Sequence, residues 1–315
     1  MNKLAVIFGL KGHTLTSGEK KLFKKIKPWG IILFSRNIKN IIQLKKLIDE
    51  IKVIFNDKKY PILIDQEGGR VSRLNNILDF SVFSQNLFGK IYQTDKKLFS
   101  IIYKIYVDNV CEIFSKAGIN INTVPVLDIF RKRSHTIIGD RSFGINPKNV
   151  SKLGKVCINL YSKKKIGTVI KHIPGHGLAI SDSHYKTPII YESKKNLIRN
   201  DFKPFKSCKA LFAMTAHVIY PIYDPLNTVT HSKIIINKII RSHIKFRGLL
   251  ISDDISMKSL KYSLENNAIK ALRAGCNLVL HCNGNIREMY RLAKVIPKID
   301  NFTRKKTSHF IKFLG

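Results

Sequence analysis

The stretch YPILIDQEGG (residues 60–69) joins a short apolar run to two acidic residues and a Gly-Gly break. A run that is apolar at successive positions is typical of a parallel strand buried on both faces. The same pattern recurs in LAVIFGL (4–10), GIILFSRN (30–37), ININTVPVLD (119–128), GTVIKHIPGHG (167–177), ALFAMTAHVIY (210–220), RGLLISDD (247–254) and CNLVLHCNG (276–284). Eight such strands alternating with helices predict an α/β fold, a single (β/α)8 TIM barrel occupying residues 1–315.

Two of the intervening stretches predict helices. In IIQLKKLIDEIKVIF (41–55) apolar residues recur at steps of three and four, and LFSIIYKIYVDNVCEIFSKAG (98–118) ends on a glycine stop. A doubly wound open sheet would share this alternation of strands and helices. The first strand is not followed by G-x-G-x-x-G, however, and this favours the barrel.

The chain is strongly basic, with 56 Lys and Arg residues against 21 Asp and Glu and a formal net charge of +35. Such a balance invites a nucleic-acid-binding interpretation. The basic runs, such as KKLFKKIK (20–27) and YSKKKIG (161–167), are scattered, which is more typical of solvated helix faces. A codon bias toward Lys, Ile and Asn would produce this scatter, so we expect no specific nucleic-acid partner.

Cysteine usage and hydropathy indicate a reducing compartment. The five cysteines are odd in number, lie largely in apolar runs and form no C-x-x-C motif, as expected of reduced, buried thiols. The N-terminal apolar run meets Lys11 at once and lacks a small-residue cleavage site, so we interpret it as a strand and not as a secretion signal. No apolar stretch approaches the 18 or so residues of a membrane span. We therefore expect a cytoplasmic monomer without membrane association.

Polar residues gather where the predicted strands end. These residues are Asp65, Asp128, His172, His176, His217, Asp253, Asp254 and Asn283. In (β/α)8 barrels the active site forms where strands end and the loops to the helices begin. Acidic residues are scarce in this chain, so those that lie next to the apolar runs are candidates for catalytic or binding roles. The pattern predicts an enzyme with its active site at the C-terminal ends of the strands.

The motif SDDISM (252–257) holds two adjacent acids. Neighbouring strand residues point to opposite faces, so we expect one carboxylate in the mouth of the barrel and the other packed outward, against a helix N-terminus. This arrangement suits a lone carboxylate that is ionised at neutral pH. The alternative is an aspartate that caps the following helix.

The motif DQEGGRVSRL (65–74) runs from a strand end through two glycines to Arg70 and Arg73. The glycines let the backbone turn tightly and let a ligand approach closely. A carboxylate that accepts hydrogen bonds and an arginine that donates several suit the hydroxyl groups of a sugar. A structural ion pair between Asp65 and an arginine is the alternative.

The motif KHIPGHGLAISDSH (171–184) contains three histidines, which a turn alone does not explain. A zinc site is disfavoured, because Pro174 and Gly175 break any helix that would bring His172 and His176 to one face, and H-E-x-x-H is absent. The preferred interpretation is a catalytic loop, in which Asp182 orients His184 so that its imidazole gives and takes a proton near neutral pH.

At these motifs the sequence resembles the bacterial β-N-acetylhexosaminidases of glycoside hydrolase family 3. The segments IDQEGGRV, PVLDI, IGDRSFG, KHIPGHGLAISDSH, AHVIYPIYDP, ISDDISM and CNLVLHCNG occur in the family's order over roughly residues 4–285. The resemblance implies a barrel that releases a terminal β-linked N-acetylglucosamine with retention, without a metal or organic cofactor. The usual substrate of the family is a muropeptide, N-acetylglucosaminyl-1,6-anhydro-N-acetylmuramic acid with an attached peptide, met in cell-wall recycling.

The resemblance also assigns roles to residues. It implies that Asp253 is the nucleophile and that His184 is the acid/base, with Asp182 as its partner. The positions implied to hold the sugar are Asp65, Arg73, Arg141, Lys171 and His172. A phosphorylase is the nearer alternative, since a histidine acid/base would not repel incoming phosphate. A nucleic-acid-binding barrel is the more distant one.

Overall fold

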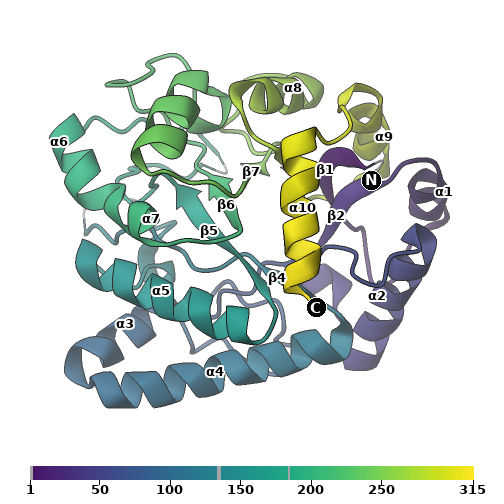
Figure 1. The fold of residues 1–315 in the computed structure, drawn as a ribbon, viewed down its shortest axis with the longest axis horizontal. Coiled ribbons are helices and arrows are strands. Elements are labelled where there is room, and N and C mark those ends of the chain that lie inside the picture. The colour runs from purple at the N-terminus through teal and green to yellow at the C-terminus, as the bar shows by residue number, and fades with distance from the viewer. Residues whose placement is uncertain (1–2, 133–135, 184) are drawn as a thin grey trace.

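Eight parallel strands form a closed barrel in the computed structural model, which describes residues 3–132, 136–183 and 185–315. The strands follow one another in chain order, and pairing of β1 with β8 closes the ring. They are β1 (Leu4–Gly9), β2 (Pro28–Leu33), β3 (Ile62–Ile64), β4 (Ile121–Asn122), β5 (Gly167–Ile173), β6 (Phe212–Thr215), β7 (Leu249–Asp254) and β8 (Leu278–His281). Each apolar run that predicted a strand overlaps one, so the predicted TIM barrel is confirmed (Figure 1).

Helices connect the strands and surround the barrel. The α-helices are α1 (Ser17–Lys25), α2 (Ile41–Phe55), α3 (Gln85–Thr94), α4 (Lys96–Ala117), α5 (Pro147–Lys163), α6 (Lys194–Asn196), α7 (Lys203–Ser207), α8 (Leu264–Ala274), α9 (Ile286–Val295) and α10 (Asn301–Phe313). Shorter 3₁₀ turns are η1 (Ser35–Asn37), η2 (Gly139–Arg141) and η4 (Val229–His231), and π-helical segments are η3 (Leu197–Asp201) and η5 (Ile235–His243). None of the helices in the described part of the chain has the length and apolar character to span a membrane.

Local signals explain where the two predicted helices begin and end. The side chain of Asn40 caps α2 by accepting the backbone N–H of Gln43, and the helix ends at Asn56 with a left-handed φ of 45°. The carboxylate of Asp95 caps α4, which ends at Gly118 with a φ of 92°. The observed helices therefore match the predicted ranges 41–55 and 98–118 closely.

The strand β4 is shorter than its apolar run. After Thr123, whose backbone N–H still donates to the carbonyl of Ile64 in β3, the chain continues beside β5, where the backbone N–H of Leu127 donates to the carbonyl of Lys171 at 2.7 Å. Lys171 in turn donates its backbone N–H to the carbonyl of Pro125 at 3.2 Å. This extended segment carries Asp128 alongside the end of β5, into reach of the site described below.

An aromatic cluster closes the N-terminal end of the barrel. The ring of Phe212 lies between those of Trp29 and Phe310, with ring centroids 5.6 and 5.2 Å away. The indole N–H of Trp29 donates to the hydroxyl of Thr307 at 2.8 Å. Helix α10, yellow in Figure 1, is thereby fixed to β2 and β6. The opposite end of the barrel, where the strands terminate in polar residues, holds the cavity.

Candidate active site

A cavity of about 170 Å³ lies at the C-terminal ends of the strands. Its lining includes eight of the residues that the sequence singled out, namely Asp65, Arg73, Arg141, Lys171, His172, His176, Asp253 and Asp254. They come from β5, β7 and the loops that follow β3, β4 and β5. Residues that are far apart in the sequence therefore meet at the predicted end of the barrel.

Asp65 receives three donors at the end of β3. Its carboxylate accepts hydrogen bonds from the ammonium of Lys171 and the hydroxyl of Thr123, both at 2.5 Å, and pairs with the guanidinium of Arg73 at 2.9 Å. Burial would raise the pKa of Asp65, but the charges of Lys171 and Arg73 hold it well below its usual range. The side chain is thus an ionised acceptor over the whole physiological pH range.

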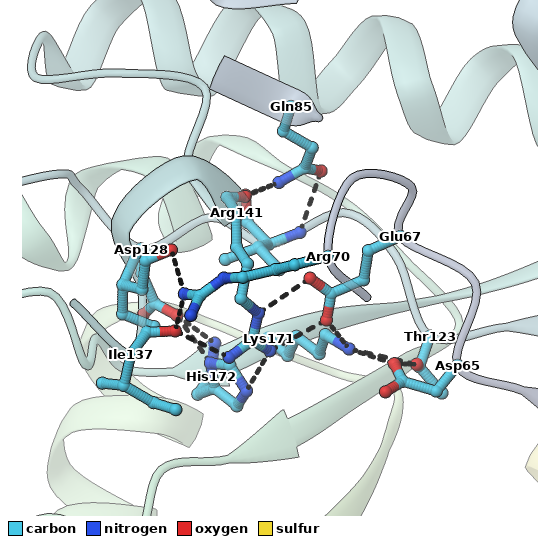
Figure 2. A network of polar contacts seen from close by, with 12 residues as sticks. Asp65, Glu67, Arg70, Gln85, Thr123, Asp128, Ile137, Arg141, Lys171 and His172 are labelled. Atoms are coloured by element: carbon cyan, nitrogen blue, oxygen red, sulfur yellow. Dashed lines mark hydrogen bonds and ion pairs between the residues drawn. The ribbon is translucent and has the colours of Figure 1, made fainter. Parts of the chain in front are cut away.

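Glu67 is a buried carboxylate that organises the cationic side of the cavity, as Figure 2 shows. Arg141 binds it through two parallel hydrogen bonds of 2.8 Å, and the ammonium of Lys171 lies 2.5 Å away. Burial would raise the pKa of Glu67, but Arg141 and Lys171 lower it. Glu67 also raises the pKa of Arg141 above its usual value, although burial opposes this. Both cations are therefore held in place by charge-assisted hydrogen bonds.

The loop after β3 is supported from behind by α3 and α4. The hydroxyl of Tyr106 donates to the backbone carbonyl of Glu67 at 3.1 Å. Gly68 adopts a φ of 87°, and a Cβ there would lie 2.2 Å from the carbonyl oxygen of Phe83. Only glycine fits this approach. Gln85, at the start of α3, donates to the backbone carbonyls of Val126 and Arg141 and accepts the backbone N–H of Val126 (Figure 2). These bonds tie the loop after β4, which carries Arg141, to helix α3.

His172 is oriented by Asp128. Its Nδ1 lies 2.6 Å from the Asp128 carboxylate, and its Nε2 lies 3.5 Å from a guanidinium nitrogen of Arg141. Because Arg141 can only donate, Nδ1 carries the proton in this arrangement and Nε2 accepts. Burial would raise the pKa of Asp128, but His172 and His176 lower it. Lys171 and His172 both line the cavity although they are neighbours in β5, whose register with β6 shifts between Lys171 and Ile173.

Asp253 lies at the end of β7 with its side chain on the cavity. Burial would raise its pKa, but His217, His172 and the backbone N–H of Asp254 lower it, so the carboxylate is ionised at neutral pH. The ring of His217 supports this strand end: its Nε2 donates to the backbone carbonyl of Asp254 at 3.0 Å, while its Nδ1 accepts from the hydroxyl of Thr230 at 2.7 Å.

The expectation for Asp254 was wrong in part. Asp254 lines the cavity together with Asp253, so the two acids are not separated as the alternation of a regular strand predicts. The Asp254 carboxylate does not pack against a helix N-terminus; it accepts the N–H and hydroxyl of Ser256 and the N–H of Cys282. The reason is that the register between β7 and β8 shifts between Ile251 and Asp254, so the strict alternation of a regular strand ends there.

The loop after β5 is anchored at its start. The backbone N–H of His176 donates to Asp128 at 2.6 Å, and its Nε2 lies 3.2 Å from the hydroxyl of Ser183, a second residue of the cavity wall. Gly177 is buried, and a Cβ there would lie 2.1 Å from the carbonyl oxygen of Ile129. Burial, with the neighbouring His172, lowers the pKa of His176 to about 4.

Asp182 belongs to a turn next to the cavity. The backbone carbonyl of Asp182 accepts the N–H groups of Tyr185 and Lys186 at 3.1 and 3.0 Å, which makes a turn beside the cavity residue Ser183. His184, the predicted acid/base, lies outside the described residues. Its role therefore stays a prediction.

Sequence reasoning missed Glu67, Thr123 and Ser183 as members of the site. Glu67 had a usable signal, since it is an acid between a strand end and Gly68-Gly69 in a chain poor in acids. Thr123 and Ser183 carried none. No group of three or more His, Cys, Asp or Glu side chains within the described residues is placed to hold a metal ion.

Comparison with known proteins identifies the family. A model of the glycosyl hydrolase family 3 N-terminal domain matches residues 5–307. A β-hexosaminidase of Idiomarina loihiensis is 34% identical over 311 residues, covering 97% of this chain and 92% of that protein. One of Nitrosomonas eutropha is 32% identical over 286 residues, covering 88% and 80%. The crystal structure of NagZ from Neisseria gonorrhoeae in complex with N-trifluoroacetyl-D-glucosamine has a TM-score of 0.87 at 28% identity, covering 98% of this chain and 90% of that one. The matched range contains β2 to β8, all but the first residue of β1, and all described cavity residues, so this chain belongs to glycosyl hydrolase family 3 and is a glycoside hydrolase.

Proposed function

We propose that this protein is a retaining exo-β-N-acetylglucosaminidase that removes terminal β-linked N-acetylglucosamine from muropeptides of the N-acetylglucosaminyl-1,6-anhydro-N-acetylmuramic acid type. Its relatives named β-hexosaminidase support the activity, and the NagZ complex with an N-acylated glucosamine supports the sugar. We also propose that the protein is a monomer with a single domain, and that it acts in the cytoplasm in the recycling of the cell wall.

The observation that carries the proposal is the shared cavity of Asp253 and the five sugar-binding candidates. The volume of about 170 Å³ is below the roughly 300–1,000 Å³ of pockets for drug-sized ligands, which favours a single terminal ring over an internal segment of a glycan. Asp65 offers acceptors, while Arg73, Arg141 and Lys171 offer donors, as the hydroxyl and acetamido groups of such a ring require.

In the proposed reaction the Asp253 carboxylate attacks the anomeric carbon while His184 gives a proton to the departing glycosidic oxygen. The C–O bond to the aglycone breaks, and a covalent glycosyl ester with Asp253 forms. His184, now neutral, takes a proton from water, whose oxygen attacks the anomeric carbon and releases the sugar with its β configuration retained. Asp182 orients the imidazole and stabilises its protonated form. The lowered pKa of Asp253 suits a nucleophile.

Substitution of the two central residues tests the proposal. We expect Asp253→Ala to abolish release of the chromophore from 4-nitrophenyl β-N-acetylglucosaminide, and His184→Ala to lower kcat about 100- to 10,000-fold. Asp49→Ala, which removes an exposed partner of Lys45, is the matched control and should keep full activity. Circular dichroism should show both variants folded.

Two further arms of the assay separate the alternatives. Activity that survives intact in Asp253→Ala or His184→Ala would overturn the assigned roles. N-acetylglucosamine 1-phosphate formed in the presence of phosphate would identify a phosphorylase, whereas the proposal requires the free sugar with or without phosphate. Loss of activity with a chelator, restored by zinc, would contradict the metal-free mechanism.

A further inference from the structure

A second cavity lies at the other end of the barrel, where the strands begin. Its volume of about 480 Å³ is within the roughly 300–1,000 Å³ typical of small-molecule sites. The wall includes Phe212, the first residue of β6, and Gly248, which directly precedes β7, and it continues onto helices α7 and α10. Among the described residues, none lines both this cavity and the candidate active site. It is therefore a separate feature of the molecule, and we call it the basal cavity.

The floor of the basal cavity is apolar. It is formed by four buried side chains and one half-buried side chain, namely Phe205, Phe212, Ile244, Phe246 and Leu211. Backbone groups beside them are already bonded, since the carbonyl of Leu211 accepts the N–H of Leu249 at 3.0 Å. The carbonyls of Phe246 and Gly248 accept hydrogen bonds of 3.1 and 2.9 Å from the Arg241 guanidinium. This surface has few groups to bind a polar ligand and suits a hydrocarbon.

The wall of the basal cavity is fixed by contacts behind it. The Arg241 guanidinium also donates to the side chain of Asn277 at 2.9 Å, and it lies 5.5 Å from the centroid of the Phe246 ring. The ring of Phe212 belongs to the aromatic cluster that closes this end of the barrel. The cavity is therefore preformed, which lowers the conformational cost of binding.

The rim of the basal cavity is cationic. Among the described residues, five basic side chains and no acidic one line the cavity, and the five are Lys206, Lys209, Lys245, Arg247 and Lys306. All of them are exposed except Lys306, which is half-buried. No carboxylate in the described part of the chain lies within ion-pair distance of these five, whereas exposed lysines elsewhere, such as Lys45 and Lys104, have such a partner. The positive charge of the rim thus remains available to a ligand.

The floor and the rim of the basal cavity together define the ligand. Ammonium and guanidinium groups bind an anion through charge-assisted hydrogen bonds, and lysine stems extend the apolar surface toward the rim. A polyanion without an apolar part, such as DNA, would leave the floor in contact with water. A peptide that entered the floor would bury backbone N–H and C=O groups without partners, which costs free energy. A single hydrocarbon chain with an anionic head group satisfies both parts of the cavity.

We propose that the basal cavity binds a soluble amphiphile that consists of a single hydrocarbon chain and an anionic head group, such as a phosphate monoester. The chain packs on Phe205, Phe212 and Phe246, and the head group is bound by Lys209 and Arg247 at the rim. This inference goes beyond the proposed glycosidase function, because it assigns a ligand to residues that take no part in hydrolysis.

Decyl phosphate, kept below its micelle concentration, is the probe that tests the site. We expect isothermal titration calorimetry to show saturable binding of one molecule per chain. Trp29 is the only tryptophan and its ring lies 5.6 Å from that of Phe212, so its fluorescence should change with the same midpoint. Octyl phosphate should bind about four- to fifteenfold more weakly, because each buried methylene contributes about fourfold. Decanol and inorganic phosphate, which each supply one part of the ligand, should bind more weakly by about tenfold or more.

Charge reversal at the rim tests the contacts with the head group. Lys209→Glu combined with Arg247→Glu should weaken the binding of decyl phosphate by about tenfold or more. Lys46→Glu combined with Lys97→Glu is the matched control and should bind like the wild type, because it makes the same change in net charge at exposed positions of α2 and α4. Ala210→Phe places a ring in the cavity without a change in charge and should also weaken binding about tenfold. Circular dichroism should show all three variants folded.

Several outcomes would contradict the proposal. Equal weakening in the rim variant and in its control would show a general effect of charge and refute the site, and wild-type affinity in the rim variant or in Ala210→Phe would also refute it. Binding to phosphatidylglycerol vesicles without binding of monomeric decyl phosphate would identify a face that docks on lipid bilayers in place of a small-molecule site. None of these measurements depends on hydrolysis, so the site and the glycosidase function can each fail alone.

Discussion

Buried carboxylates give the site its shape at the scale of single residues. In a chain with 56 Lys and Arg and 21 Asp and Glu residues, Asp65 lines the cavity, and Glu67 and Asp128 hold side chains that line it. Each holds a cationic or imidazole side chain that the family resemblance assigns to sugar binding. Removing one partner of such a buried pair leaves an uncompensated charge, which commonly costs about 3–5 kcal/mol. The scarcity of acids elsewhere therefore makes these positions stand out.

His176 predicts a pH dependence of stability. Its folded-state pKa is about 4, below the roughly 6.5 of an unfolded chain. Above pH 6.5 both states are neutral at this residue and the effect vanishes. As the pH falls, the unfolded state binds the proton first, so the free energy of unfolding decreases until the pH reaches about 4. From this residue we expect a loss of about 2 kcal/mol between pH 7.5 and pH 5.

Urea unfolding at the two pH values measures this loss. His176→Gln should flatten the dependence by about that amount, whereas the exposed His309→Gln should leave it unchanged. An equally steep pH dependence in His176→Gln would show that another group is responsible.

The loop after β5 depends, at the scale of elements, on a backbone approach that only glycine permits. Gly177 packs against the carbonyl of Ile129, so Gly177→Ala must displace either the loop or the segment that carries Asp128. We expect a loss of about 100-fold in kcat/KM, since a shift of about 1 Å in a catalytic loop has that effect. Thermal unfolding should also show a decrease of roughly 1–3 kcal/mol in stability.

Gly12→Ala provides the control, because no atom lies within 4 Å of a Cβ built at that position. It should retain both activity and stability. Full activity in Gly177→Ala would mean that the loop tolerates the displacement. The close packing of Gly177 against the backbone of Ile129 is a sufficient reason for a glycine at this position.

The regular elements were predictable from sequence because burial leaves a local pattern. Runs apolar on both faces marked all eight strands, and cap residues marked the ends of α2 and α4. The exceptions are places where contacts between distant segments override the pattern. The register shifts in β5 and β7 are of this kind: they bring both Lys171 and His172 to the cavity and turn the carboxylate of Asp254 toward Cys282. The local sequence contains no pattern that predicts these register shifts.

The net charge of +35 acts at the scale of the whole molecule. It should give weak, sequence-independent binding to DNA through phosphate contacts alone. We expect a labelled duplex of about 20 base pairs to bind in 50 mM salt and to be released by 200 mM, with no difference between unrelated sequences. Fluorescence anisotropy measures this, and tight sequence-selective binding in 200 mM salt would revive the nucleic-acid interpretation.

The candidate site was predictable only where a resemblance supplied the roles. Position at a strand end selected Asp65, His172 and Asp253, but the same criterion also selected His217, which supports the backbone of β7. Arg141 and Lys171 came from the resemblance alone. Glu67, which holds both of them, acts through a three-dimensional contact that neither route contains.

The pairing of β1 with β8 joins strands from opposite ends of the sequence. During synthesis the first seven strands leave the ribosome as an open sheet with two unpaired edges, which invite pairing with other chains. The barrel can close only after β8 has been synthesised, so the fold cannot be completed until nearly the whole polypeptide has emerged. Until that moment the net charge of +35 keeps the unfinished chains apart, because like-charged polypeptides repel one another and associate less readily.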